Sequence, residues 1–384
     1  MATIFKTLLK NDVVSTKTLL HEKVPITGST VSGTYGTFPN DSNIKDYAHG
    51  LFQSVYDFPH LSSSANHIFD ISVGYSTGTV SVSGTAVDAD AIQISEKVNI
   101  YNQMAQVLQG HDANGKISRF DVFSEIFSPA LDATKLDNVF FINFARLLGK
   151  DEIKKGSFTL KLGVGTTLTA PFAGTLLTIQ DNEAWLDYRV NSPAGEYGLL
   201  KATNGYNTEL TGSIVCGLIF YQAGVVVLSG SVFMSGSSEN NGSENRGAGA
   251  GMLTASVSMS RDNTYNTWLT GGFSAVLATS SISGACNEIR RRIYDISFDN
   301  TSELNSVIHF CRINHNEFNY SSNPSYLSSG KIVTKNNALD APVSLITGIG
   351  LYSADNELLA VAKLSNPLLN SATKEMAIQV RLDY

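Results

Sequence analysis

Residues 342–364 read PVSLITGIGLYSADNELLAVAKL. Two runs rich in apolar residues flank residues 353–356, where small and polar side chains are typical of a turn. This pattern predicts a β-hairpin. Residues 377–382 follow, and their apolar and polar side chains alternate, which predicts a last strand with one face in water.

Most of the chain before this hairpin also has the pattern of strands. Short segments rich in β-branched residues and bounded by turn residues predict strands at 67–73, 79–83, 157–162, 174–180, 214–228 and 252–260. Apolar residues at helical spacing predict one helix at 92–109, with Asp90 near its start and Gly110 at its end. A second helix is predicted at 137–149. It is apolar nearly all round, so we expect it to be buried.

These elements predict an α+β protein that is mostly antiparallel β. We expect four segments: an extended N-terminal arm at 1–64, a helix-containing unit at 65–155, a β-rich unit at 156–284 with a Gly/Ser/Asn-rich loop at 229–251, and a C-terminal β unit at 285–384 with the hairpin at 343–364. The arm must satisfy its backbone hydrogen bonds, and pairing with a neighbouring subunit is one solution.

Composition indicates a surface that is largely covered or weakly charged. Of the 384 residues, 42% are hydrophobic and 16% are charged, against about 25% charged in typical domains. This fits a protein covered by partners, or a β-rich protein decorated with Ser, Thr and Asn. The net charge of −7 argues against duplex nucleic acid as the main partner.

Basic residues cluster at one place, Arg290, Arg291 and Arg292. We interpret the cluster as a solvated or interface face, with nucleic-acid contact as the weaker alternative.

Three cysteines, Cys216, Cys286 and Cys311, form no disulfide framework and indicate buried thiols of a protein made in a reducing cytoplasm. We expect no signal peptide and no membrane-spanning segment.

Two motifs resemble known sites. Residues 74–78 match the G-x-S-x-G pattern of a nucleophile elbow, but the β-branched residues after it predict a returning strand, so we interpret it as a hairpin turn. Residues 112–121 resemble part of a calcium loop. The first ligand position falls on Gly110 and the last on Asp121, so we favour an Asn-Gly turn after a helix.

Other candidate sites carry weaker signals still. His309, Cys311 and His315 lack the paired cysteines typical of zinc sites. Asp88 and Asp90 lie where a helix begins, which favours capping over acid–base chemistry. Phosphate-loop and dinucleotide motifs are absent from the sequence. The sequence therefore predicts no catalytic residues, no cofactor and no small-molecule ligand.

Three stretches resemble one group of proteins: Tyr101-Asn102-Gln103-Met104-Ala105, EFNYSSNP at 317–324, and GLYSADNELLAVAKLS at 350–365, with the ending VRLDY at 380–384. Together they resemble virion structural proteins of large contractile-tailed bacteriophages, notably the cyanobacterial ones. The resemblance implies membership of a particle, but no position in it and no catalytic residues.

From this resemblance we expect a non-enzymatic virion protein, made in the host cytoplasm, whose partners are its own copies and other virion proteins. A tail, baseplate or neck position is favoured, with a capsid or capsid-decorating protein and a receptor- or glycan-binding module as alternatives; Tyr265, Trp268 and Tyr326 are candidates for the last. The alternation of Phe318 and Tyr320 with polar residues indicates either core packing on the hairpin or docking of a neighbour. Interface candidates are Phe318, Tyr320, Leu351, Tyr352, Arg290, Arg291 and Arg292.

Overall fold

The computed structural model describes residues 5–25, 42–76, 93–121, 135–136, 138–163, 172, 176–204, 214–230, 281–318, 324–328, 331–332 and 343–384. The chain divides into two compact units. The central unit is His21–Ser302, and the terminal unit combines both chain ends, Met1–Leu20 and Glu303–Tyr384. The four-segment division expected from the sequence stays a prediction.

The predicted fold class is confirmed, because the protein is mostly antiparallel β with few short helices. Fourteen strands share one hydrogen-bonded sheet. Along its main path they are β1 (Val13–Pro25), β15 (Ile293–Ile313), β9 (Thr159–Leu162), β10 (Leu177–Gln180), β12 (Gly195–Asn204), β13 (Ile214–Phe220), β14 (Val225–Ser229), β7 (Asn138–Phe144), β4 (His67–Tyr75), β3 (Gln53–Tyr56) and β2 (Ile44–Asp46). Off this path are β8 (Glu152–Ile153), β11 (Arg189–Ser192) and β20 (Met376–Asp383).

The described residues also form three small two-stranded sheets. They are β5 (Phe120–Asp121) with β6 (Lys135–Leu136), β16 (Leu327–Ser328) with β17 (Lys331–Ile332), and β18 (Val343–Tyr352) with β19 (Leu358–Ser371). The helices are α1 (Ile94–Leu108), α2 (Arg146–Gly149), α3 (Ala184–Asp187), α5 (Ile282–Arg292) and the 3-10 turns η1 (Lys10–Asp12) and η4 (Pro324–Tyr326). The predicted strands at 79–83 and 252–260, and the loop at 231–251, lie outside the described residues.

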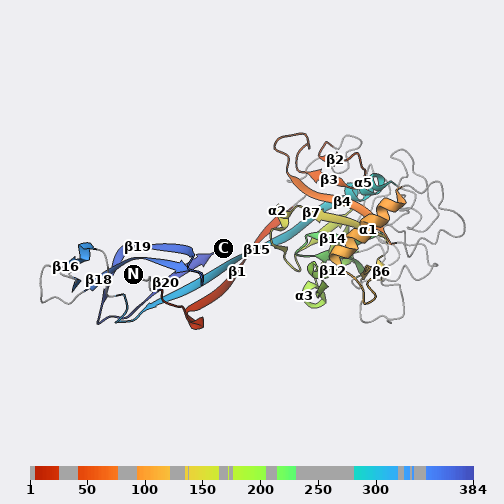
Figure 1. The fold of residues 1–384 in the computed structure, drawn as a ribbon. Coiled ribbons are helices and arrows are strands. Elements are labelled where there is room, and N and C mark those ends of the chain that lie inside the picture. The colour runs from red at the N-terminus through yellow and green to blue at the C-terminus, as the bar shows by residue number, and fades with distance from the viewer. Residues whose placement is uncertain are drawn as a thin grey trace. The chain divides into compact units, whose positions relative to one another are not determined.

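The central unit buries both faces of its sheet (Figure 1). Neighbouring residues of β7 point to opposite sides, so Phe140 packs in one hydrophobic cluster and Phe141 in the other. Helix α5 contributes Ile282 and Ile289 to the first cluster, and α1 contributes Tyr101 to the second. The described part of this unit therefore has a large hydrophobic cluster on each face of its sheet.

The prediction of a helix at 137–149 is wrong for most of this segment. Residues 138–144 form β7, which pairs with β4 on one side and β14 on the other. A central strand covered on both faces is apolar at every position, and so is a buried helix, so periodicity does not separate them. Only α2, at the end of the segment, is helical.

The helix predicted at 92–109 is confirmed as α1. Tyr101, Ala105 and Leu108 face the core as expected, and Lys97 is buried on the same helix. Gly110 ends the helix with a φ of +78° and donates its N–H to the carbonyl of Ala105.

The terminal unit is built on the last part of β15. Residues Ser306–Ile313 of β15 pair with β20, which confirms the predicted last strand. On its other side β15 pairs with β1, and the hydroxyl of Thr16 contacts the carbonyl of Ser306 at 3.5 Å. Strand β1 of the N-terminal arm thus pairs with a strand of its own chain. Pairing with a neighbouring subunit is not needed for this part of the arm.

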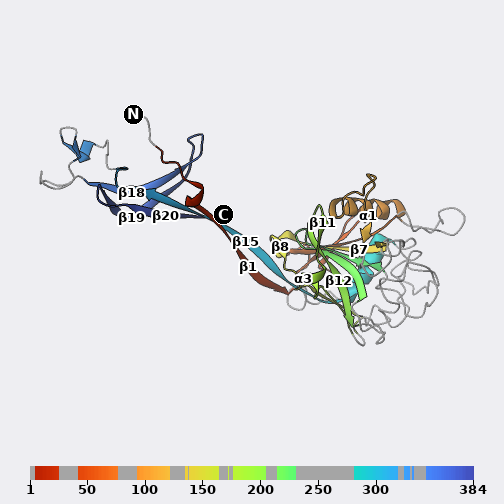
Figure 2. The same ribbon diagram turned by 90° about the horizontal axis from the view of Figure 1, so that it is seen from below.

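The predicted hairpin is confirmed and is longer than expected. β18 and β19 lie side by side in both ribbon views (Figures 1 and 2), with Gly350 opposite Val361 and Val343 opposite Ser371. The turn is closed by the N–H of Ser353, which donates to the carbonyl of Glu357, and Asn356 has a φ of +61°.

Candidate assembly interface

The terminal unit has almost no hydrophobic core in the single chain. Among its described residues, only three apolar side chains are buried, Ile313, Val343 and Val380. Five polar residues of the same unit are buried. Neither hydrophobic cluster of the described structure has a member from this unit.

Large apolar side chains of the terminal unit face solvent instead. Fifteen of the described ones are exposed, against nine in the much larger central unit. They are Phe5, Leu9, Val14, Leu19, Leu20, Leu304, Phe318, Leu345, Tyr352, Leu358, Leu359, Val361, Leu368, Leu369 and Tyr384. A domain of this size with so little buried apolar surface has little to offset its loss of conformational entropy, which makes these exposed side chains a candidate interface.

The β18–β19 hairpin carries apolar side chains on both of its faces. Ile349 and Ala362 are opposite one another and partly buried. Gly350 and Val361, the next opposed pair, project to the other face, where Val361 is 60% exposed. A strand pair with apolar side chains on both faces is typical of a sheet covered on both sides.

Predicted interface residues near the hairpin are at the surface. Tyr352 is exposed and contacts the ring of Phe5, with 4.6 Å between ring centroids. Phe318 is 48% exposed, which does not fit the core alternative for its side chain. Its carbonyl accepts a hydrogen bond from the hydroxyl of Ser344, so its backbone docks on β18. Leu351 is partly buried, and Tyr320 lies outside the described residues.

The prediction that the arginine cluster forms an exposed face is wrong. Arg290, Arg291 and Arg292 occupy the last turn of α5 and are buried, with 3% exposure at most. Arg292 donates to the carbonyl of Gly163 at 3.1 Å. Cations at a helix C-terminus interact favourably with its dipole, so these residues support the central unit and offer no surface.

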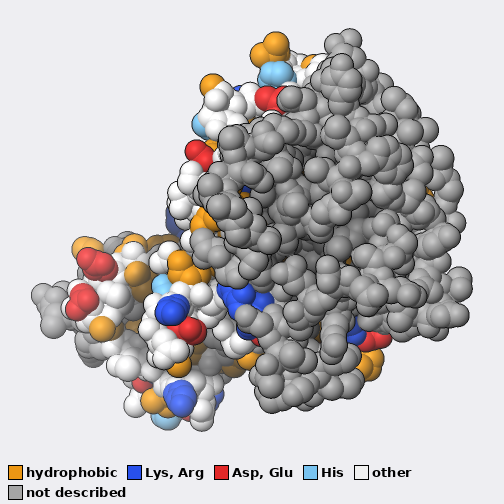
Figure 3. All heavy atoms as spheres, turned by 90° about the vertical axis from the view of Figure 1, so that its right-hand side faces the viewer, with side chains coloured by type: hydrophobic (Ala, Val, Ile, Leu, Met, Phe, Trp, Pro, Cys, Tyr) orange, Lys and Arg blue, Asp and Glu red, His pale blue; other side chains and the backbone are white. Residues whose placement is uncertain are grey.

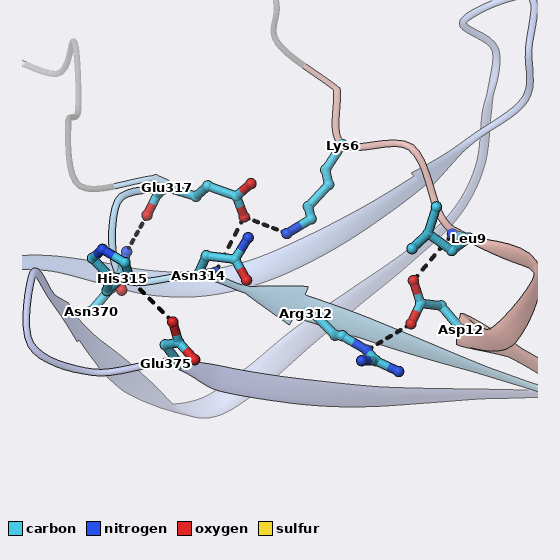
Figure 4. A network of polar contacts seen from close by, with 9 residues as sticks. All are labelled: Lys6, Leu9, Asp12, Arg312, Asn314, His315, Glu317, Asn370 and Glu375. Atoms are coloured by element: carbon cyan, nitrogen blue, oxygen red, sulfur yellow. Dashed lines mark hydrogen bonds and ion pairs between the residues drawn. The ribbon is translucent and has the colours of Figure 1, made fainter.

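Charged residues of the terminal unit pair with one another (Figure 4). Arg312 contacts Asp12 at 2.6 Å, and His315 contacts Glu375 at 3.1 Å. The Lys6 ammonium donates to Glu317, and this hydrogen bond holds the pKa of the Glu317 carboxyl below its usual value. Beside these pairs, fifteen large apolar side chains are exposed on the described part of the unit.

The weak motifs take structural roles. The carboxylate of Asp112 accepts hydrogen bonds from the N–H groups of Asn114 and Lys116 at 2.9 Å, which confirms the predicted turn after α1. Gly74 lies where α1 crosses β4, and a Cβ on it would be 3.0 Å from the Cα of Tyr101. Tyr75 and Ser76 are buried, and residues 77–78 of the elbow motif lie outside the described residues.

The described part of the chain contains no group of three or more His, Cys, Asp or Glu side chains placed to hold a metal ion. None of its helices is long and apolar enough to cross a membrane. Asp88, Asp90, Tyr265 and Trp268 lie outside that part.

A second exposed apolar group, missed in the sequence, lies on the central unit at α3 and β11. Trp185 is 70% exposed, Leu186 63% and Val190 67%. Lys201 holds α3 in place through ion pairs with Glu183 and Asp187. Elsewhere, on the described part of the face drawn in Figure 3, apolar side chains are interspersed with charged and polar ones. The exposure of Trp185 depends on tertiary structure, so no local pattern could have indicated it.

Comparisons of this chain with protein-family models, curated proteins and solved structures found no match.

Proposed function

We propose that this protein is a non-enzymatic structural subunit that assembles with copies of itself through the terminal unit. One observation carries the proposal: the described residues of the unit include three buried apolar side chains and fifteen large exposed ones. Covering them is worth about 25 cal/mol for each Å² of apolar surface removed from water. The central unit, which has its own core, then serves as the rigid body that assembly positions.

A second copy is the partner that fits this surface best. Ion pairs between Lys17 and Glu303 and between Arg381 and Asp383 add to those already described, so more than half of the unit's described charged side chains are paired within it. A partner selected by charge would need unpaired charges of one sign. Identical apolar surfaces associate without like-charge repulsion, and most soluble oligomers are symmetric homo-oligomers.

Particle membership rests on the resemblance of residues 101–105, 317–324 and 350–365 to phage virion proteins. We propose a tail, baseplate or neck position, reached by assembly after synthesis in the host cytoplasm, with a capsid position as the alternative. Other virion proteins would be its further partners.

Mass spectrometry of purified phage particles tests this part of the proposal. We expect the protein among the particle components, at a copy number that matches a symmetric position. Its presence in infected cytoplasm and absence from washed particles would contradict particle membership.

A receptor- or glycan-binding role is the second candidate, and Trp185 favours it. An exposed tryptophan on a firmly held helix is a typical binding anchor. Glycan-array binding that is lost in Trp185→Ala, with the oligomer intact, would support this role. An array without signal for the parent protein would count against it.

A further inference from the structure

We propose that β18 pairs edge to edge with β18 of a second copy, so that two hairpins join into one antiparallel sheet across the subunit boundary. This inference rests on the proposed self-assembly and specifies the contact that drives it. It gives the assembly a twofold contact, in which the same strand contributes from both copies.

The free edge of β18 lacks the charged residues and prolines that prevent strand addition, while its pairing with β19 has register shifts between Ile346 and Gly348 and between Leu351 and Tyr352. Its ten residues, VSLITGIGLY, include no charged residue and no proline. Among the strands that the structure describes, it pairs with β19 alone. Long, uncharged edges expose a row of backbone donors and acceptors, and natural proteins leave them open mainly where another strand binds.

Neighbouring strands of the terminal unit are protected by comparison. β19 contains Lys363 and Pro367, and β20 contains Arg381. The terminal-unit part of β1 contains Lys17. Lysine, arginine and proline are the residues that block edge pairing. β15 already has partners on both sides in this unit, β1 and β20. β18 is therefore the edge best suited to accept a strand.

Pairing β18 with itself also satisfies the side-chain rules for antiparallel strands. In a twofold arrangement each residue faces another residue of the same uncharged strand, so no like charges are opposed. Thr347 and Ile349 lie near the middle of the strand and carry β-branched side chains, which pack well across strands. The joined hairpins would also place the exposed Val361 side chains of both copies on one continuous sheet.

A single-cysteine scan tests the pairing in the full chain. Cys311, the partly exposed native thiol, is replaced by serine, while Cys216 and Cys286 stay because they are fully buried. Cysteines are then placed one at a time along residues 344–351, and disulfide-linked dimers are measured after mild oxidation. Antiparallel neighbours have Cα atoms about 4.5–5.5 Å apart, within the range that a disulfide spans.

Only a residue at or beside the twofold axis meets its own counterpart. We therefore expect cross-linking to peak at one position of β18 and to fall away within two residues on either side. Ser365→Cys, on an exposed position of β19, is the matched control and should stay unlinked. As a second variant, Thr347→Lys at an exposed position should shift the equilibrium toward monomer, whereas Ser365→Lys should not.

Two failures are distinguishable. A parent protein that sediments as an oligomer, with no cross-linking peak on β18 and no effect of Thr347→Lys, overturns the strand-pairing inference and leaves self-assembly standing. A parent protein that stays monomeric overturns both.

Discussion

Replacing Leu358 and Leu359 with serine and Val361 with threonine should dissociate the assembly without unfolding the chain. These side chains are 52%, 67% and 60% exposed in the single chain, so they add little to its own stability. Added together, their exposed fractions equal the surface of just under two complete side chains. Burying a complete Val or Leu side chain contributes roughly 1.5–3 kcal/mol, so the triple variant should lose about 3–5 kcal/mol of association free energy per copy.

Each 1.4 kcal/mol changes a dissociation constant about tenfold, so the loss from one copy alone corresponds to two to four powers of ten, and both copies of a twofold contact contribute. Sedimentation velocity over a dilution series measures it directly, and thermal unfolding of the monomeric fraction checks that the central unit stays folded. The matched control replaces Trp185 and Leu186 with serine and Val190 with threonine; these residues are 70%, 63% and 67% exposed on the central unit. Equal dissociation of both variants, or of neither, would refute the assignment of assembly to the terminal unit.

Three further predictions concern buried and paired charges. Asp181→Asn should lower the free energy of unfolding by about 1–3 kcal/mol in denaturant titration, because the buried carboxylate accepts two backbone N–H groups at 2.7 and 2.8 Å and an amide cannot replace both acceptors. Lys97→Met should raise the melting temperature at pH 7 but not above pH 10.5. Burial lowers the Lys97 pKa from 10.5 to about 8, so keeping the lysine charged in the folded protein costs stability. This loss of stability disappears as pH rises from about 8 to 10.5. Acidification below the usual Glu pKa of 4.5 should speed hydrogen exchange in the terminal unit before the central unit. The hydrogen bond from Lys6 lowers the Glu317 pKa, so the stability that the Glu317 carboxylate contributes is present above pH 4.5 and is lost as pH falls through the lowered value. A Glu317→Gln variant whose hydrogen-exchange pattern at neutral pH equals that of the parent would argue against this.

Elements with a local signal could be predicted from the sequence. The hairpin was identified because a turn at 353–356 separates two apolar runs, and the last strand because its residues alternate. Helix α1 was identified from its spacing and from Gly110. In each case the deciding interactions lie within a few residues, so tertiary structure does not change the outcome.

Features set by long-range contacts could not be predicted. β7 was interpreted as a helix because a strand buried on both faces loses its alternation. The arginines of α5 were interpreted as a surface because their burial depends on segments far away in sequence, such as Gly163. The terminal unit joins residues 1–20 to residues 303–384, and no local pattern shows that the two chain ends meet.

The role of the predicted interface residues stays a prediction. Tyr352 and Phe318 are exposed, and the sequence had left core packing open for Phe318. The shortage of buried apolar side chains in the terminal unit was not visible, because an apolar strand has the same sequence whether its cover comes from its own chain or from a neighbour.

The mass of the purified full-length protein in solution tests the central claim most directly. At micromolar concentration we predict a defined multiple of the 41.3 kDa chain, with β18 and β19 protected from hydrogen exchange. A stable 41.3 kDa species at every concentration, with the same two strands protected, would contradict the claim that the terminal unit completes its core between chains.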